Sequence, residues 1–227
     1  MSFNLRLPTL CLGACLLAAA GCENPADNVA QATVADAETI DQAPAADTGD
    51  AADQAGESLV LSAENTTIEF VGSKVTGSHD GGFKEVSGNW KLTDDDPAQS
   101  RLEAEIDMNS TWSDSDNLTA HLKNEDFFDV EKFPTSKFVS TKIAPLETPD
   151  ENHKDATHTV TGNLTLHGVT KSISFPAQIT IADAQPTLKS EFHLNRKDFD
   201  IAYTGKADDL IRDEVVIKLT IDPAKSN

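Results

Sequence analysis

The fold of this chain is constrained most by a two-residue alternation of apolar and polar side chains that recurs along it. Between Arg101 and Met108 four apolar residues alternate with four charged residues. Successive side chains of a β-strand point to opposite faces, so this pattern predicts a strand with one apolar and one polar side. The same pattern returns three more times, and four further runs are rich in β-forming residues. We therefore expect eight strands, at residues 67–74, 83–92, 101–108, 137–143, 157–166, 173–181, 188–194 and 215–221.

These segments predict an all-β domain of antiparallel strands that share one apolar face. Eight such strands close into a barrel whose interior is filled by side chains or holds one small or elongated ligand. A two-sheet sandwich has the same alternation and remains an alternative. The run Asp80-Gly81-Gly82 predicts a hairpin turn between the first two strands. Pro176 predicts an edge position or a bulge in the sixth strand.

A stretch from Asn117 to Pro134 interrupts the pattern between the third and fourth expected strands. It combines short helix signals with acidic residues and three phenylalanines. Its apolar side chains need a dry environment, which a closed sheet offers in its interior or at its mouth. We therefore expect a short helical insert that packs there through Leu118, Leu122, Phe127 and Phe128.

Residues 1–21 have the layout of a secretory signal, in which Arg6 precedes an apolar stretch at 10–20 that is too short to span a bilayer. The end of this signal resembles the lipobox of bacterial lipoproteins, which implies that Cys22 becomes the acylated first residue. A second match ends at Cys15 and leaves a hydrophobic stretch of only about seven residues; a plain secreted protein is the third interpretation. We expect a lipid-anchored protein of the bacterial cell envelope, and Glu23 favours the outer membrane, with the protein facing the periplasm.

Residues 22–57 carry nine acids and no Lys or Arg, and they are rich in Ala, Asp and Gln. Such a segment buries too little apolar surface to offset its ordering entropy, so a disordered acidic tether is expected. A random coil of about 35 residues would hold the folded domain, residues 58–227, roughly 30–35 Å from the membrane.

The sequence of the domain gives little sign of chemistry or of nucleic-acid binding. All three cysteines lie at or before Cys22, and the six histidines lack metal-binding spacing. No P-loop, dinucleotide-binding or nucleophile-elbow motif is present, and the acids of the insert are explained more simply as helix caps than as a catalytic pair. The 29 acids and 17 bases outside residues 1–57 argue against nucleic acid and against direct docking on anionic headgroups. No cofactor, metal site or catalytic residue is therefore expected.

Three motifs occur together in an order that is typical of one known family. The first is His121-Leu122 with Asp126-Phe127-Phe128 and Phe133-Pro134, and the others are TGNLTLHGVTK at 161–171 and FHLNRKDF at 192–199. Through these motifs residues 59–222 resemble the YceI-like family of periplasmic proteins. The resemblance implies a lipocalin-like, eight-stranded barrel that binds polyisoprenoids or other long-chain lipids. It departs from the family at Asp200, where glycine is common, so the turn there is expected to need a positive φ.

The candidate ligand-binding side chains are the large apolar residues expected on the inner face of the barrel. Their alternative role is to fill the interior as an ordinary core. These residues are Phe70, Phe83, Trp90, Ile106, Met108, Phe127, Phe128, Phe138, Phe175 and Phe192.

The candidate polar residues come from the family motifs and are His121, Asp126, His167 and Arg196. We expect the two histidines to meet at one end of the barrel or, more simply, to fix turns through hydrogen bonds. The Arg196 and His121 ends are the candidates for binding a head group.

The expected function is that of a periplasm-facing lipoprotein that binds and sequesters or carries one polyisoprenoid- or quinone-like molecule inside the barrel, without catalysis. The expected partners are this ligand and, through the lipid anchor, the membrane. The alternative is a structural or interaction protein of the cell envelope whose barrel is filled by side chains. The oligomeric state is not set by the sequence.

Overall fold

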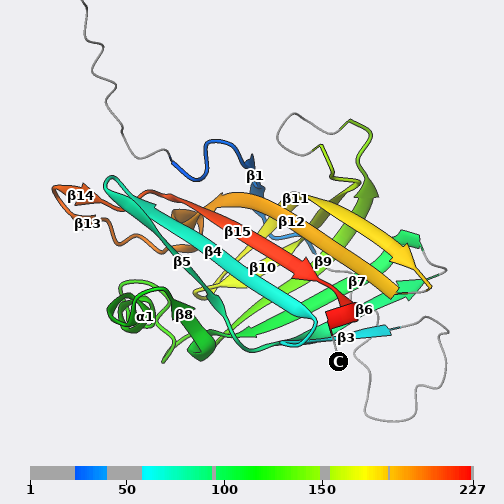
Figure 1. Cartoon of the computed structure of the whole chain (residues 1–227), viewed down its shortest axis with the longest axis horizontal. Helices are drawn as coiled ribbons and strands as arrows, with labels where there is room; N and C mark the ends of the chain where they lie inside the picture. Colours follow the sequence, from blue (N-terminus) through cyan, green and yellow to red (C-terminus); the bar gives the residue numbers. More distant parts are fainter. Residues whose placement is uncertain (1–23, 40–57, 94–95, 149–153, 184, 226–227) are drawn as a thin grey trace, which may run out of the picture.

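The structure is a computed structural model that describes residues 24–39, 58–93, 96–148, 154–183 and 185–225 (Figure 1). Among these residues none of the helices is long and apolar enough to cross a membrane. In chain order the elements are β1 (Ala30–Gln31), β2 (Thr33–Asp36), β3 (Ser58–Ser62), β4 (Thr66–Lys74), β5 (Gly77–Phe83), β6 (Val86–Thr93), β7 (Asp96–Asp107), η1 (Met108–Ser110), β8 (Thr111–Ser113), α1 (Asp116–Leu122), β9 (Thr135–Pro145), β10 (His158–Leu166), β11 (Val169–Ala182), β12 (Gln185–Asn195), η2 (Arg196–Phe199), β13 (Gly205–Lys206), β14 (Asp209–Leu210), β15 (Glu214–Ile221) and η3 (Pro223–Lys225).

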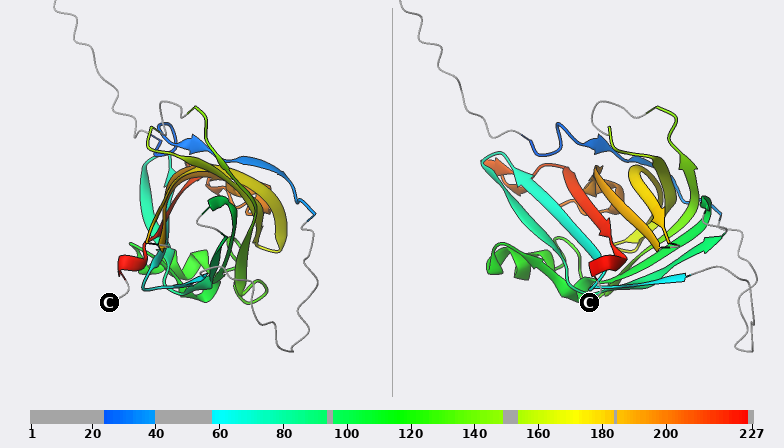
Figure 2. Two further views of the ribbon diagram at one scale, coloured as in Figure 1. Left: turned by 90° about the vertical axis from the view of Figure 1, so that its right-hand side faces the viewer. Right: turned by 45° about the vertical axis from the view of Figure 1, so that its right-hand side comes forward.

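The strands curl around one axis into a barrel (Figure 2). Antiparallel pairing runs in the order β6-β7-β9-β10-β11-β12-β15-β4-β5. β5 continues through Lys84 and Glu85 into β6, and β7 continues through η1 into β8. Because β5 pairs with β8 and β6 pairs with β7, the ladder returns to its starting strand. The predicted all-β, barrel-like fold is therefore confirmed, and the sandwich is not formed.

All eight predicted segments are strands, and the described residues contain seven further strands. Pro176 lies in β11 just before β12 joins it, because the direct β11–β12 pairs begin at Gln178. Proline has no N–H for a ladder bond, and its carbonyl instead accepts a hydrogen bond from Ser190 Oγ at 2.6 Å. No ladder pair with β2 or β12 falls at Pro176, so the expected edge position is found locally on this side of β11, whereas the ladder to β10 passes Pro176 without the bulge that was the alternative.

The predicted hairpin turn at Asp80-Gly81-Gly82 is wrong. These residues lie within β5, and the turn falls between Lys74 and Gly77, which pair directly. The glycines are needed for close approach rather than for a turn, since a Cβ on Gly81 would lie 2.4 Å from Cζ of Phe70. Phe70 therefore occupies the space that a side chain on the neighbouring strand would have taken.

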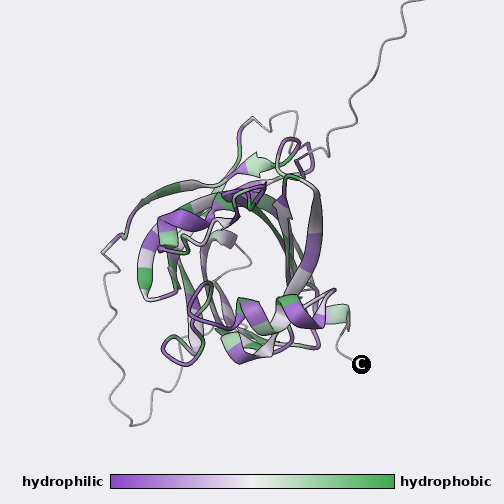
Figure 3. Ribbon diagram, turned by 90° about the vertical axis from the view of Figure 1, so that its left-hand side faces the viewer, coloured by the Kyte–Doolittle hydropathy of each residue, from purple (hydrophilic) through white to green (hydrophobic). Residues whose placement is uncertain are grey.

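The helical insert is found at the predicted place, between β8 and β9, and contains one α-helix, α1. The helix lies at the rim of the barrel end that faces the viewer in Figure 3. The residues that follow α1 form turns rather than a second helix. Asp200, after η2, has the predicted left-handed conformation with φ = 57°.

The other end of the barrel is filled by side chains. Its core includes Trp90, Leu102, Ile143, Val160 and Leu188, each at most 2% exposed. Close packing of this kind is the ordinary core that was considered as an alternative to a cavity, and it occupies one end of the barrel only.

The disordered tether predicted for residues 22–57 is wrong for residues 24–39, whereas residues 40–57 lie outside the described residues. β1 pairs in parallel with β12, and β2 pairs antiparallel with β11. The apolar residues Ala30, Ala32 and Val34 face the core. These residues alternate with polar ones as in a strand. The alternation is hard to recognise in the sequence because the apolar side chains are small and acids flank them.

Candidate functional site

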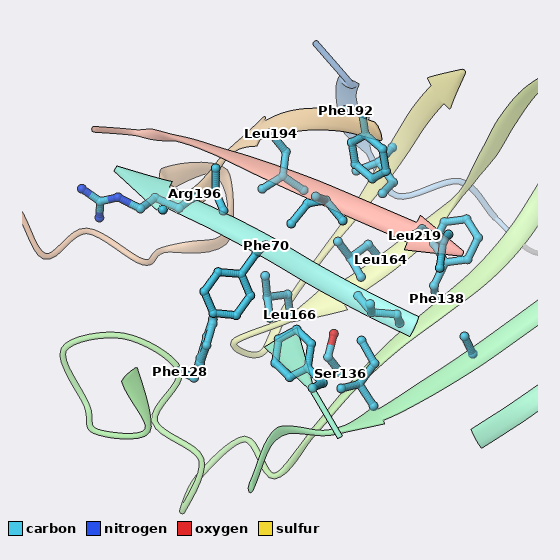
Figure 4. A pocket seen from close by; sticks show the side chains of 18 of the residues that line it. Phe70, Phe128, Ser136, Phe138, Leu164, Leu166, Phe192, Leu194, Arg196 and Leu219 are labelled. Carbon is cyan, nitrogen blue, oxygen red and sulfur yellow. The ribbon is translucent and has the colours of Figure 1, made fainter. Parts of the chain in front are cut away.

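An apolar cavity of about 210 Å³ lies inside the barrel between the filled end and the insert (Figure 4). Strands β4, β5, β7, β9, β10, β11, β12 and β15 contribute to its wall. The polar side chains among its lining residues are Thr66, Ser73, Ser136, Arg196 and Arg212. Ser136 Oγ donates a hydrogen bond to the carbonyl of Thr165 at 2.8 Å. The wall is therefore suited to an apolar molecule held by burial of its surface.

Eight of the ten predicted lining residues lie on the wall: Phe70, Phe83, Ile106, Phe127, Phe128, Phe138, Phe175 and Phe192. Their contact with a ligand remains a prediction.

Trp90 and Met108 do not line the cavity, and their predicted place there is wrong. Trp90 is fully buried in the filled end, where its Nε1 donates a hydrogen bond to Ser100 Oγ at 3.0 Å. Met108 follows the last residue of β7 and begins η1, so the alternation of the strand no longer sets its direction.

The insert closes the end of the cavity with aromatic side chains. Phe128 packs against Phe70 and Phe83, with ring centroids 6.3 Å and 5.9 Å apart. Phe127, which is 7% exposed, packs against Tyr203 at 5.3 Å. The phenylalanines of the insert therefore plug this mouth, as Figure 4 shows for Phe128 beside Phe70.

His121 and Asp126 hold the insert in shape. His121 Nε2 lies 2.8 Å from Asp126 Oδ2, and the imidazole ring packs edge-on against Phe127 at 5.0 Å. The two motif residues thus fix the turn that presents Phe127 and Phe128 to the barrel.

His167 fixes a different turn, between β10 and β11. It has a positive φ of 51°, and its Nδ1 lies 3.2 Å from the carbonyl oxygen of Phe199. Its ring packs against Phe133 at the end of the insert, with centroids 4.8 Å apart. His121 and His167 therefore have different partners, and the structural role considered for them fits this geometry.

Arg196 is 4% exposed, and its guanidinium is engaged by the protein. Its Nη1 donates to the carbonyl of Ile201 at 2.6 Å, its Nε to the carbonyl of Arg212 at 3.1 Å, and its Nη2 to Asp213 Oδ1 at 3.3 Å. Burial lowers the pKa of this guanidinium, and the nearby Asp213 carboxylate partly offsets the shift. Arg196 thus joins η2 to the segment before β15 at the edge of the cavity, and its expected role in binding a head group remains a prediction.

The sequence prediction missed the segment after η2 and the N-terminal strands. Ile201 is 3% exposed and packs with Leu122 and Phe127, and Ile211 lines the cavity. This segment has no sustained alternation, so periodicity could not identify it.

Most of the residues that line the cavity are apolar. Among the described residues of the wall there is no carboxylate and no histidine. Nowhere in the described part of the chain do three His, Cys, Asp or Glu side chains gather in a way that could hold a metal ion.

The fold and the cavity define a class of protein: an antiparallel β-barrel, filled at one end, that encloses an apolar chamber under a helical insert. The profile of the YceI-like domain matches residues 59–222, and the chain belongs to this family. The strands β1 and β2 precede the matched region.

The chain is similar to curated UPF0312 proteins. It is 37% identical over 97 residues to one from Pseudomonas putida strain F1, covering 43% of this chain and 47% of the relative. It is 33% identical over 99 residues to one from Photorhabdus laumondii, covering 44% and 47%. The matched region thus spans about half the length of these relatives.

Two solved structures share the fold. Burkholderia cenocepacia BcnA aligns with a TM-score of 0.59 at 23% identity, over 69% of this chain and 94% of that one. A polyisoprenoid-binding domain from Saccharophagus degradans, implicated in plant cell wall breakdown, aligns with a TM-score of 0.53 at 16% identity, over 73% and 98%.

Proposed function

We propose that the barrel binds one elongated apolar molecule, polyisoprenoid- or quinone-like, and sequesters or carries it without chemical change. The observation that carries this proposal is the apolar chamber between the filled end and the insert. The polyisoprenoid-binding domain that shares the fold supports the ligand class. Burial of a hydrocarbon tail is worth roughly 25 cal/mol per Å² before the costs of association, and the described residues of the wall include no carboxylate or histidine that could act on the ligand as an acid–base pair.

Native mass spectrometry of the purified full-length protein tests this proposal. We expect a bound apolar molecule, or uptake of added farnesol, in the wild type. Ala104→Phe places a ring in the cavity, since Ala104 lies on its wall, and should abolish the adduct. Glu105→Phe adds the same ring at the next, exposed position of β7 and should leave the adduct intact.

A ligand-free wild type that takes up no farnesol would overturn the binding function and leave the structural role as the better account. If the recovered molecule is converted during incubation with the protein, the non-catalytic part of the proposal fails.

We also propose that Cys22 carries the lipid anchor and that the protein faces the periplasm from the outer membrane. The support is the lipobox-like run that ends at Cys22, a segment outside the described residues. Labelling of cells with radioactive palmitate should mark the wild type and the Cys15→Ser variant but not the Cys22→Ser variant. Loss of label only in Cys15→Ser would reassign the anchor.

A further inference from the structure

The barrel has a seam between β11 and β12. Their direct pairs extend only from Gln178 with Lys189 to Ala182 with Gln185. Towards the insert end the two strands pair with the N-terminal segment instead. β11 pairs with β2 from Lys171 to Ser174, and β12 pairs with β1 at Phe192 and His193.

Residues 30–38, here called the strap, fill this seam (Figure 1). Between the two short strands, the backbone N–H of Ala32 donates to the carbonyl of His193 at 2.8 Å. The end of the strap is held by the side chain of Asn163, whose amide donates to the carbonyl of Glu38 at 2.7 Å and accepts from its N–H at 2.9 Å. The strap therefore completes the barrel wall with backbone pairing on both of its edges.

The cavity is lined by residues of β11 and β12 on the two sides of the seam, whereas no residue of the strap lines it. Ile173 and Phe175 of β11 and Phe192 and Leu194 of β12, on the two sides of the seam, are all lining residues. Ala32 packs into the same apolar cluster and is 3% exposed. With the strap moved outward, the stacked rings of Phe175 and Phe192 would be the layer left between the solvent and the chamber at this place.

The strap contributes smaller apolar side chains to the barrel than the plug at the mouth does, and backbone pairing holds its two edges. It contributes side chains no larger than valine to the core, namely Ala30, Ala32 and Val34, and the ion pair between Lys171 and Asp36 involves a fully exposed carboxylate. The mouth is closed by the large rings of Phe127 and Phe128, which pack against aromatic partners. When the strap leaves, only small apolar side chains leave the core, so opening the seam chiefly requires breaking its backbone pairs and parting the stacked rings of Phe175 and Phe192.

We propose that the seam between β11 and β12 is a lateral entrance to the cavity for an elongated apolar ligand, and that the strap is its removable gate. This inference rests on the proposed binding function. A tail can enter sideways along the seam while the insert stays in place.

Two engineered disulfides test the gate, because they fasten the strap to both neighbouring strands. Ala35→Cys with Ser172→Cys joins β2 to β11, and Gln31→Cys with His193→Cys joins β1 to β12; both are register pairs. The native cysteines are changed to serine in every variant of the full-length chain. The control pair, Glu105→Cys with Lys137→Cys, joins β7 to β9 away from the seam.

Binding of cis-parinaric acid, a fluorescent fatty acid, is followed by stopped flow. In the doubly locked protein we expect association and dissociation both to slow at least about tenfold, with similar affinity, and reduction to restore them. The control disulfide should change neither rate. Asn163→Ala, which releases the end of the strap, should accelerate both rates by about threefold or more.

Equal rates in the oxidised and reduced forms of the doubly locked protein would overturn the gate and assign entry to the mouth. Absence of binding in every form, with the folded state verified by circular dichroism, would instead count against the proposed binding function itself. The two failures are therefore distinguishable.

Discussion

The rings of Phe175 and Phe192 stack across the seam, with centroids 4.4 Å apart and planes inclined by 12°. They stand on β11 and β12 beyond the point where the direct ladder between these strands ends at Gln178 and Lys189. Both rings are 3% exposed. Beneath the strap, side-chain stacking thus replaces backbone pairing as the direct link between the two strands.

This link predicts energetic coupling between the two phenylalanines. In a double-mutant cycle of Phe175→Leu and Phe192→Leu, the free energies of unfolding should depart from additivity by about 0.5–1.5 kcal/mol. Phe192→Leu combined with Phe83→Leu serves as control, since the ring partners of Phe83 are Phe70 and Phe128, and should be additive. Urea denaturation supplies the values; an additive Phe175–Phe192 cycle would contradict a direct link.

The stability of the fold should depend sharply on the size of the side chain at position 81. Gly81→Ala should lower the free energy of unfolding by about 1–3 kcal/mol, because its Cβ would lie 2.4 Å from the ring of Phe70. Gly77→Ala in the same strand is the control, as a Cβ there meets nothing within 4 Å. The measurement is again urea denaturation. Equal effects of the two substitutions would show that the close approach carries no cost.

Replacing Asp200 with glycine should stabilise the fold. Its φ of 57° is strained for an L-residue with a side chain, so Asp200→Gly should raise the free energy of unfolding by about 0.5–1 kcal/mol. Asp198→Gly, within η2, should lower it by a similar amount because no positive φ is relieved there. Thermal denaturation checks both variants, and a destabilising Asp200→Gly would mean that the carboxylate has a role of its own.

The partly buried imidazole of His158 should cause part of the loss of folding stability at low pH. Burial lowers the pKa of its imidazole from the usual 6.5, and Asp96 partly offsets the shift. As the pH falls, His158 therefore takes up its proton in the unfolded chain before it does so in the folded one. The stability that comes from keeping this imidazole neutral is complete above pH 6.5 and is lost as the pH falls below it. His158→Gln should flatten the fall in unfolding free energy between about pH 7 and pH 5. Identical pH profiles for variant and wild type would refute this assignment.

The sequence was informative where the alternation was strong and where motifs were local. All eight predicted strands exist, and eight of the ten candidate residues line the cavity. Six of the eight lie on strands, where periodicity fixes which side chains point inward, whereas Phe127 and Phe128 lie in the insert and were identified from their apolar character and the family motif. Trp90 has the right inward direction but lies in the filled end, and periodicity along one strand contains no information about position along the barrel axis.

The remaining errors have specific physical causes. Gly81 and Gly82 looked like turn residues, but the constraint on them is long-range: the Phe70 ring and the Trp112 side chain occupy the space above them. The strap was missed because its alternation uses alanine, which contributes little to a hydrophobicity signal. Its burial is set by the gap that β11 and β12 leave, which depends on the whole barrel rather than on nearby residues.

The strap also changes the mechanics of attachment. The described chain begins at Asn24, and Ala26 is already buried at 5% exposure. Were Cys22 acylated, as proposed, two residues spanning about 7 Å at most would connect the acyl chains to Asn24. The connection to the membrane would then be short, so a displacement of the barrel relative to the bilayer would pull directly on the N-terminal segment that includes the strap.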